Sequence, residues 1–289
     1  MCSGSSVEAK TVRRSGNFCG ACREDIERNR QMPGLEIHQF PCLDDNYAYL
    51  VHVEGSDVTA AIDTPDADAI IAELDKRGWT LTHILNTHWH PDHAGGNAAL
   101  KQRYGALVIA PADPEGRIAD IDRTVRDSDR LDLGGAEVKV LGVPGHTTDH
   151  VAFWFPETGA AFVGDTLFAL GCGRLFEGTP EQMWESLGKL TALPADTMVY
   201  CAHEYTASNA RFAVTIEPGN AELVERVDHI RRLREADTPT VPTTIGLELR
   251  TNPFLRTRSA EIRDRLEMPE DEDVAVFAEV RARKDSFKG

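Results

Sequence analysis

This chain of 289 residues lacks any apolar run near the roughly 18 residues that cross a membrane, and it lacks the hydrophobic stretch of a secretory signal. Its six cysteines have no dense or regular spacing, which argues against a disulfide scaffold and favours a reduced, cytoplasmic setting. Basic residues are few, 31 Lys and Arg against 47 Asp and Glu, and the formal net charge is −16. Because such a surface repels nucleic acid and anionic membrane, neither is an expected partner.

The N-terminal segment differs from the rest of the chain. Residues 1–34 are polar and rich in Ser and Arg, so they predict a disordered extension, and Met32 leaves open a start just before the first strand pattern. Cys19 and Cys22 form a CxxC in this segment. We interpret them as two free cysteines, because no second CxxC or nearby histidine pair completes a metal site.

The remainder of the chain shows two patterns. Residues 35–204 alternate strand-like and helix-like runs and predict an α/β domain, whereas residues 205–289 show mainly helical periodicity and predict a smaller helical domain. The expected strands cover 35–43, 46–53, 58–64, 82–88, 107–111, 137–144, 150–156, 160–167 and 198–203. The expected helices cover 67–77, 96–104, a segment capped by Thr179, and then 207–217, 221–236, 259–267 and 273–285.

The clearest chemical signal is the run THWHPDH at residues 87–93, which directly follows a strand. Three histidines and an aspartate so close together are poorly explained by packing, and each can give a metal ion one ligand atom. His88 and His90, two residues apart in an extended turn, point the same way and can share one ion. Asp92 and His93 then face a neighbouring position.

Three further candidate ligands lie at strand ends beside small residues. They are His146 in PGHT, Asp165 in VGDT and His203 in CAHE. The total of five histidines and two aspartates suffices for two ions with three protein ligands each, and Asp165 suits a bridge because a carboxylate has two oxygens. His150 lies close enough in sequence to support the site. The other histidines are expected to be structural: His38, His52, His83 and His229.

The order of these motifs resembles the metallo-β-lactamase superfamily. The resemblance implies an αββα sandwich with the metals at one edge, followed here by the smaller, mainly helical C-terminal domain. It also implies three histidines on a first ion, an aspartate and two histidines on a second, and a bridging aspartate. By position these are His88, His90 and His146, then Asp92, His93 and His203, and finally Asp165. Asp63 matches an aspartate that orients a ligand histidine.

Several segments are more specific and resemble the hydroxyacylglutathione hydrolases, or glyoxalase II. They are DNYAYLV (45–51), GCGRLFEGTPEQMW (171–184), CAHEYTASNARFA (201–213), EPGN (217–220) and NPFLR (252–256). The resemblance implies that residues 205–289 help to bind glutathione. The contacts it implies, with arginine and phenylalanine where other members have lysine and tyrosine, are Arg174, Phe176, Tyr205, Arg281 and Lys284.

The implied reaction is hydrolysis of S-D-lactoylglutathione, or a related 2-hydroxyacylglutathione, by a hydroxide that bridges two divalent ions. His and Asp ligands suit zinc, with iron or manganese also compatible. Asp92 and Asp165 are the candidate catalytic residues, because as ligands they could also relay protons. The only expected partner is the small thioester, and the chain is expected to be a monomer or weak oligomer.

Three alternative functions also have to be considered. A persulfide dioxygenase would need one iron and oxygen, and the helical C-terminal region with NPFLR argues against it. A lactonase or similar hydrolase would have no use for the basic cluster near the C-terminus. A metal-binding protein without activity would be expected to lack at least one ligand, whereas all seven positions are present.

Overall fold

The computed structural model describes residues 34–113 and 115–288. The predictions for the N-terminal extension, including Met32 and the CxxC of Cys19 and Cys22, therefore lie outside the described residues. No helix in the described part of the chain is long and apolar enough to cross a membrane. The three cysteines within it, Cys42, Cys172 and Cys201, are buried and unpaired.

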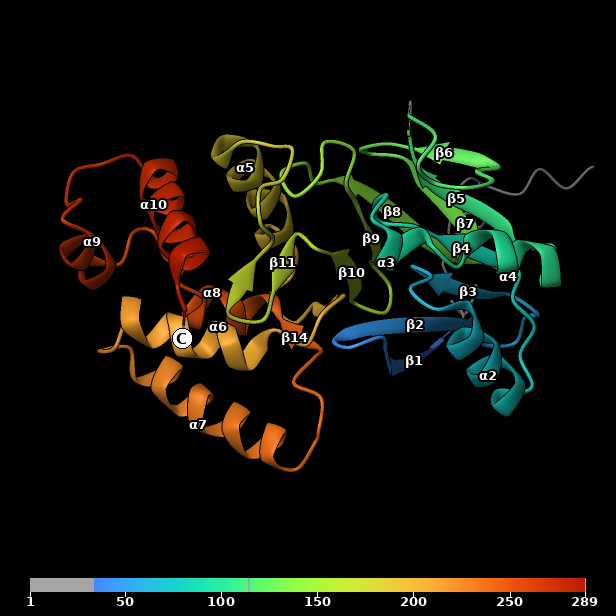
Figure 1. Ribbon diagram of the computed structural model, residues 1–289, viewed down its shortest axis with the longest axis horizontal. Helices are drawn as coiled ribbons and strands as arrows, with labels where there is room; N and C mark the ends of the chain where they lie inside the picture. Colours follow the sequence, from blue (N-terminus) through green and yellow to red (C-terminus); the bar gives the residue numbers. More distant parts are fainter. Residues whose placement is uncertain (1–33, 114, 289) are drawn as a thin grey trace, which may run out of the picture. The chain divides into compact units, whose positions relative to one another are not determined.

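Two six-stranded mixed sheets form the centre of the fold (Figure 1). The first sheet runs in sequence order through β1 (Leu35–Cys42), β2 (Asn46–Val53), β3 (Thr59–Ile62), β4 (His83–Leu85), β5 (Leu107–Pro111) and β6 (Arg123–Val125). The second sheet has the order β14 (Thr243–Thr244), β13 (Met198–Cys201), β10 (Ala160–Gly164), β9 (Val151–Phe155), β8 (Ala136–Gly142) and β7 (Arg130–Leu133). A small hairpin pairs β11 (Leu167–Phe168) with β12 (Gly171–Cys172).

Alternation along β2 explains the layers. Tyr49 and Val51 point into the core between the sheets, where the Tyr49 ring meets Phe162 of β10 edge-on at 5.3 Å. Ala48 and Leu50 point the opposite way, into a second apolar cluster. Successive strand side chains face opposite sides, so a strand apolar on both faces must be covered on both.

Helices complete the sandwich. Helices α2 (Ala67–Arg77) and α4 (Asn97–Tyr104) contribute apolar side chains to the second cluster and cover the outer face of the first sheet. Helix α5 (Pro180–Thr191) packs three buried residues, Met183, Leu187 and Leu190, into the main core. Thr179 and Gln182 close its first turn with a capping box, as the sequence predicted. The observed order of layers is therefore αββα.

The C-terminal region consists of α6 (Thr206–Ile216), α7 (Ala221–Glu235), α8 (Ile245–Thr251), α9 (Ala260–Leu266) and α10 (Asp273–Ser286). Its phenylalanines Phe212, Phe254 and Phe277 belong to the same apolar core as the sandwich. A buried ion pair between Arg226 of α7 and Glu248 of α8 joins two of the helices. The continuous core fixes α6 and α10 against the sandwich, where both border the site described below.

Several elements differ from the sequence-based expectation. The strands expected over 58–64, 82–88 and 198–203 end two or three residues earlier, at 62, 85 and 201. At each of these ends the chain leaves the sheet to present polar side chains. One turn of helix, α3 (Pro91–Ala94), occupies what was expected to be a loop. Six further short elements were not anticipated: β6, β7, β14, α8 and the two strands of the β11–β12 hairpin.

Candidate functional site

Strand ends from both sheets deliver the predicted ligands to one place. His88 and His90 follow β4, and His146 follows β8. Asp165 comes directly after β10, and His203 comes two residues after the end of β13. The chain is tightly packed there. Gly164 has φ +49°, and a Cβ at this position would lie 2.5 Å from Thr87 Oγ1, so only glycine fits.

The first set of candidate ligands consists of His88, His90 and His146. Nδ1 of His90 lies 2.9 Å from Nε2 of His88 and 3.0 Å from Nε2 of His146. All three ligand atoms lie within 4.8 Å of one another. Three imidazoles that turn a nitrogen toward a single point can hold one metal ion.

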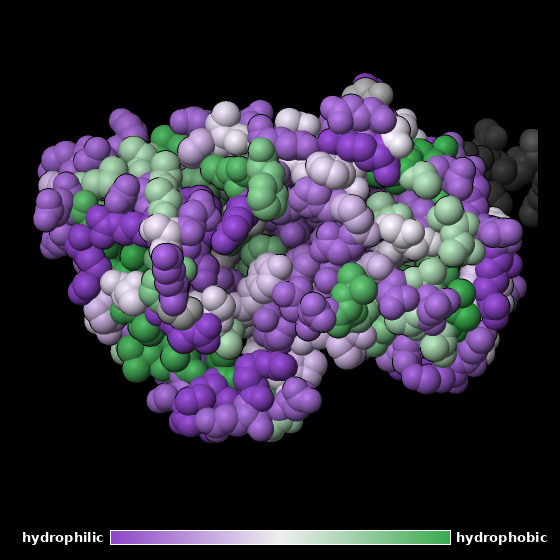
Figure 2. Space-filling model, in the orientation of Figure 1, coloured by the Kyte–Doolittle hydropathy of each residue, from purple (hydrophilic) through white to green (hydrophobic). Residues whose placement is uncertain are grey.

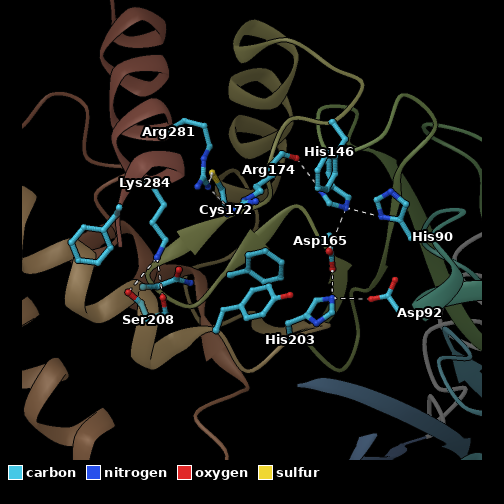
Figure 3. A pocket seen from close by; sticks show the side chains of 15 residues that line it. His90, Asp92, His146, Asp165, Cys172, Arg174, His203, Ser208, Arg281 and Lys284 are labelled. Atoms are coloured by element: carbon cyan, nitrogen blue, oxygen red, sulfur yellow. Dashed lines mark hydrogen bonds and ion pairs between the residues drawn. The ribbon is translucent and has the colours of Figure 1, made fainter. Parts of the chain in front are cut away.

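The second set consists of Asp92, His93 and His203, and Asp165 lies between the two sets. Oδ2 of Asp92 is 3.5 Å from Nε2 of both histidines. Oδ1 of Asp165 is 3.4 Å from the same two nitrogens, while its Oδ2 is 3.4 Å from Nε2 of His146. Each oxygen of Asp165 thus faces a different set, which is the geometry of a bridging carboxylate (Figure 3).

Two buried polar atoms show that this cluster fits metal ions. Nε2 of His93 and Oδ1 of Asp165 have no hydrogen-bond partner in the described structure. An unpaired buried polar atom costs about 1–3 kcal/mol, so such atoms need an explanation. A divalent cation between them would satisfy both. Nitrogen and carboxylate donors suit zinc, iron or manganese.

The protonation states of the metal-free residues differ between the two sets. Burial, reinforced by neighbouring histidines, lowers the pKa of His88 and brings that of His90 to about 4, so both are neutral and able to bind a cation. Burial opposes charge on His93 as well, but Asp165 and Asp63 outweigh it and raise its pKa to about 9, so a cation bound by His93 would displace a proton from it. Although burial favours its neutral form, His93 and His203 hold the pKa of Asp165 far below its usual range.

Asp63, expected to orient a ligand, is buried behind His93. Its Oδ2 accepts a hydrogen bond from Nδ1 of His93 at 2.8 Å, and its two oxygens also accept from the backbone N–H and hydroxyl of Thr87, at 2.7 and 2.8 Å. His150 supports the site from another side. Its Nε2 accepts the backbone N–H of Asp165 at 3.1 Å, and its ring stacks on His88.

Sequence reasoning missed Asp45, in the turn between β1 and β2, and Asn46, the first residue of β2. Oδ1 of Asp45 accepts from Nδ1 of His203 at 2.9 Å, and Nδ2 of Asn46 donates to Oδ2 of Asp92 at 3.1 Å. Both residues lie more than 40 positions before their partners, at a turn whose composition is ordinary. Their place in the DNYAYLV segment was the one available signal.

A cavity of about 530 Å³ opens from the metal ligands toward α6 and α10. Its lining includes all five residues predicted to bind substrate, of which Figure 3 labels Arg174, Arg281 and Lys284. Its lining comprises His90, Asp92, His146, Asp165, Phe168, Cys172, Arg174, Phe176, His203, Tyr205, Ser208, Asn209, Arg281, Lys284 and Phe287. One cavity therefore joins the ligand clusters at one end to a group of cationic side chains at the other.

Two of the predicted substrate residues lie beside the metal ligands. The Tyr205 ring stacks flat on His203, with centroids 4.7 Å apart. Phe176 is 63% exposed and meets the rings of His90 and His146 edge-on. Arg174 extends from the same loop, and its carbonyl accepts from Nδ1 of His146 at 2.9 Å.

The two predicted residues of α10 behave differently from each other. Arg281 is buried and donates to the carbonyl of Cys172 at 2.7 Å and to Asp285 at 2.9 Å, so it shapes the cavity wall. Lys284 donates to the carbonyl and hydroxyl oxygens of Ser208, both at 3.2 Å. Burial, followed by the positive charges around it, lowers its pKa to about 8. These cations lie in a molecule whose visible face is largely hydrophilic (Figure 2).

The αββα fold and the paired histidine–aspartate clusters are those of the metallo-β-lactamase superfamily. A sequence model of the metallo-beta-lactamase superfamily matches residues 47–203, and a model of the hydroxyacylglutathione hydrolase C-terminus matches residues 204–287. The chain belongs to the hydroxyacylglutathione hydrolase family.

Individual relatives agree with this placement. The chain is 57% identical to a hydroxyacylglutathione hydrolase of Methylococcus capsulatus over 88% of its length and all of the relative. It is 56% identical to one of Hyphomonas neptunium, covering 88% of this chain and 98% of the relative. Among solved structures, ETHE1 from Myxococcus xanthus matches with 26% identity and a TM-score of 0.59, over 87% of this chain and 99% of that one.

Proposed function

We propose that this hydroxyacylglutathione hydrolase cleaves the thioester of S-D-lactoylglutathione, or of a related 2-hydroxyacylglutathione, at a centre of two metal ions. The products are glutathione and the hydroxy acid. One observation carries the proposal: a single cavity is lined by ligands of both sets at one end and by Arg174, Arg281 and Lys284 at the other. A thioester linked to a peptide that carries two carboxylates needs both ends at once.

In this proposal the first and second sets would each hold one divalent ion, and Asp165 would offer one oxygen to each. Zinc fits the ligands best, with iron and manganese also compatible. When bound, the two ions would lower the pKa of a shared water and polarise the thioester carbonyl. His150 and Asp63 hold Asp165 and His93 in place through the hydrogen bonds described above.

Of the two candidate catalytic aspartates, Asp92 is the better placed to move a proton. Its side chain is 38% exposed at the cavity, against 9% for Asp165. Asn46 holds one of its oxygens and leaves the other free to accept a proton from the attacking water. The leaving thiol has a pKa near 8.5, so it can depart as a thiolate without a dedicated general acid.

The glutathione part of the substrate would lie against α6 and α10. Lys284 and Arg174 offer charge to its two carboxylates, and Tyr205 gives it a flat ring surface next to His203. Arg281 acts mainly through the wall that it holds together. These local cations let an acidic chain bind an anionic substrate.

The test is anaerobic hydrolysis of S-D-lactoylglutathione, compared with the same acyl group on N-acetylcysteamine, a truncated thiol. We expect turnover without oxygen, and a loss of at least about 100-fold in kcat/KM for the truncated thioester because it lacks the carboxylates. Equal kcat/KM for both thioesters would refute the glutathione site. A requirement for oxygen would refute the hydrolytic reaction itself.

A further inference from the structure

The second set of ligands is held by carboxylates that lie behind its histidines. Nδ1 of His93 meets Asp63 at 2.8 Å, and Nδ1 of His203 meets Asp45 at 2.9 Å. The third member of the set, Asp92, is itself a carboxylate. Apart from the shared Asp165, each ligand of the second set is therefore either a carboxylate or a histidine that hydrogen-bonds to a carboxylate.

The first set is held by neutral groups instead. Nδ1 of His88 lies 3.0 Å from the hydroxyl of Thr87, and Nδ1 of His146 lies 2.9 Å from the carbonyl oxygen of Arg174. His90 turns its Nδ1 toward the set, and its ring is flanked by the aromatic ring of Trp89. Within hydrogen-bond range of this set, the only carboxylate in the described structure is the bridging Asp165.

The turn that carries Asp45 is firmly attached to the second set. The backbone N–H of Glu204 donates to the carbonyl of Asp45 at 2.9 Å, and that of Tyr47 donates to Ala202 at 2.7 Å. These two backbone hydrogen bonds hold the residues immediately before and after His203. The neighbouring Asn46 is buried and holds Asp92 through its side chain. Asp45 and Asn46 thus orient two of the three ligands of the second set.

A carboxylate behind an imidazole fixes its tautomer and makes its other nitrogen a stronger donor to a cation. Negative charges close to a site also favour a cation directly. Both effects act directly on the second set, whereas in the first set the carboxylate of Asp63 reaches His88 only through the hydroxyl of Thr87. We propose that the second set binds its ion more tightly than the first and fills first, and that Asp45 is a positioning residue that strengthens this preference. The inference rests on the ligand sets of the proposed function.

Zinc binding to the metal-free protein tests the proposal, measured by competition with a chromophoric chelator. In the wild type we expect two different affinities. Asp45→Ala should weaken the tighter one by roughly 10-fold or more and leave the weaker one nearly unchanged. Asp45→Asn should have a smaller effect in the same direction, because an amide oxygen still accepts the N–H of His203 while its charge is lost.

Asp44 offers a matched control. It is exposed, directly precedes Asp45, and makes no side-chain hydrogen bond in the described structure. Asp44→Asn removes the same charge without touching His203, so both zinc affinities should stay unchanged. Because the Asp45 side chain is 45% exposed and Asn is nearly isosteric with Asp, Asp45→Asn should fold as the wild type does. Thermal unfolding of the metal-free variants checks this.

Two ligand variants locate the tighter ion. His90→Ala should retain it, whereas His203→Ala should lose it. Retention of the tighter zinc in His203→Ala, or an unchanged tighter affinity in both Asp45 variants, would overturn the proposal. A wild-type protein that binds fewer than two zinc ions would instead count against the dinuclear centre of the proposed function, so the two failures are distinguishable.

Discussion

Lys284 should make kcat/KM depend on pH in a way that follows from its pKa. Its ammonium is half-buried in the cavity, and burial together with the charges of Arg281, Arg211 and Arg174 lowers its pKa to about 8. The cation is therefore complete below pH 8 and is lost as the pH rises through that value. If Lys284 binds a carboxylate of glutathione, kcat/KM must fall over the same range, because this ratio reports the free enzyme.

The size of the effect follows from the titration. When only the charged form binds well, kcat/KM is halved at a pH equal to the pKa and falls about 10-fold one unit above it. The fall should level off where the neutral amine still binds. A charge-assisted hydrogen bond contributes about 1.5–3 kcal/mol, so the whole drop should be roughly 10- to 150-fold. The constant kcat should change little, since Lys284 lies away from the reacting carbonyl.

The assay is hydrolysis of S-D-lactoylglutathione between pH 6.5 and 9.5, corrected for the uncatalysed reaction. The matched control is Lys284→Arg, whose guanidinium stays charged throughout and should abolish the fall near pH 8. Lys284→Met should show the low value at every pH. If the arginine variant keeps the same pH profile as the wild type, another group titrates and the role given to Lys284 is wrong.

Three further predictions concern single residues. Asp63→Asn should lower the free energy of unfolding of the metal-free protein by about 1–3 kcal/mol in urea denaturation, because a buried donor on Thr87 or His93 loses its acceptor; unchanged stability would contradict the hydrogen bonds. Glu248→Ala should cost about 3–5 kcal/mol in the same assay by leaving Arg226 buried without its partner, and a loss under 1 kcal/mol would refute that reasoning. Arg281→Met should raise KM more than it lowers kcat; a collapse of kcat alone would mean that Arg281 acts at the metals.

The layers and the ligand motif could be predicted from the sequence because each depends on residues that are close together in the chain. The alternation of β2 and the capping box at Thr179 act within a few residues, and the structure shows both. The run at 87–93 carries four of the candidate ligands in one turn. The family's own motifs located the other three, although each stands alone in the sequence.

The supporting contacts could not be predicted, because they join distant parts of the chain. Asp45 meets His203 across 158 positions, and nothing in the turn distinguishes it from the adjacent Asp44. The ends of the strands were placed too late for a related reason. Asp63, for example, directly follows an apolar strand-like run. The chain nevertheless leaves the sheet there, with φ +58° at Asp63, and its carboxylate meets His93.

Hydrolysis of the glutathione thioester is expected to depend on two metal ions held by these residues. The most direct test measures anaerobic turnover of S-D-lactoylglutathione and metal content on the same samples, from metal-free protein to full loading. We predict that activity is absent from the metal-free protein and reaches its maximum near two ions per chain, and that His88→Ala lowers both activity and metal content. Full turnover by protein without metal, or by His88→Ala, would contradict the account.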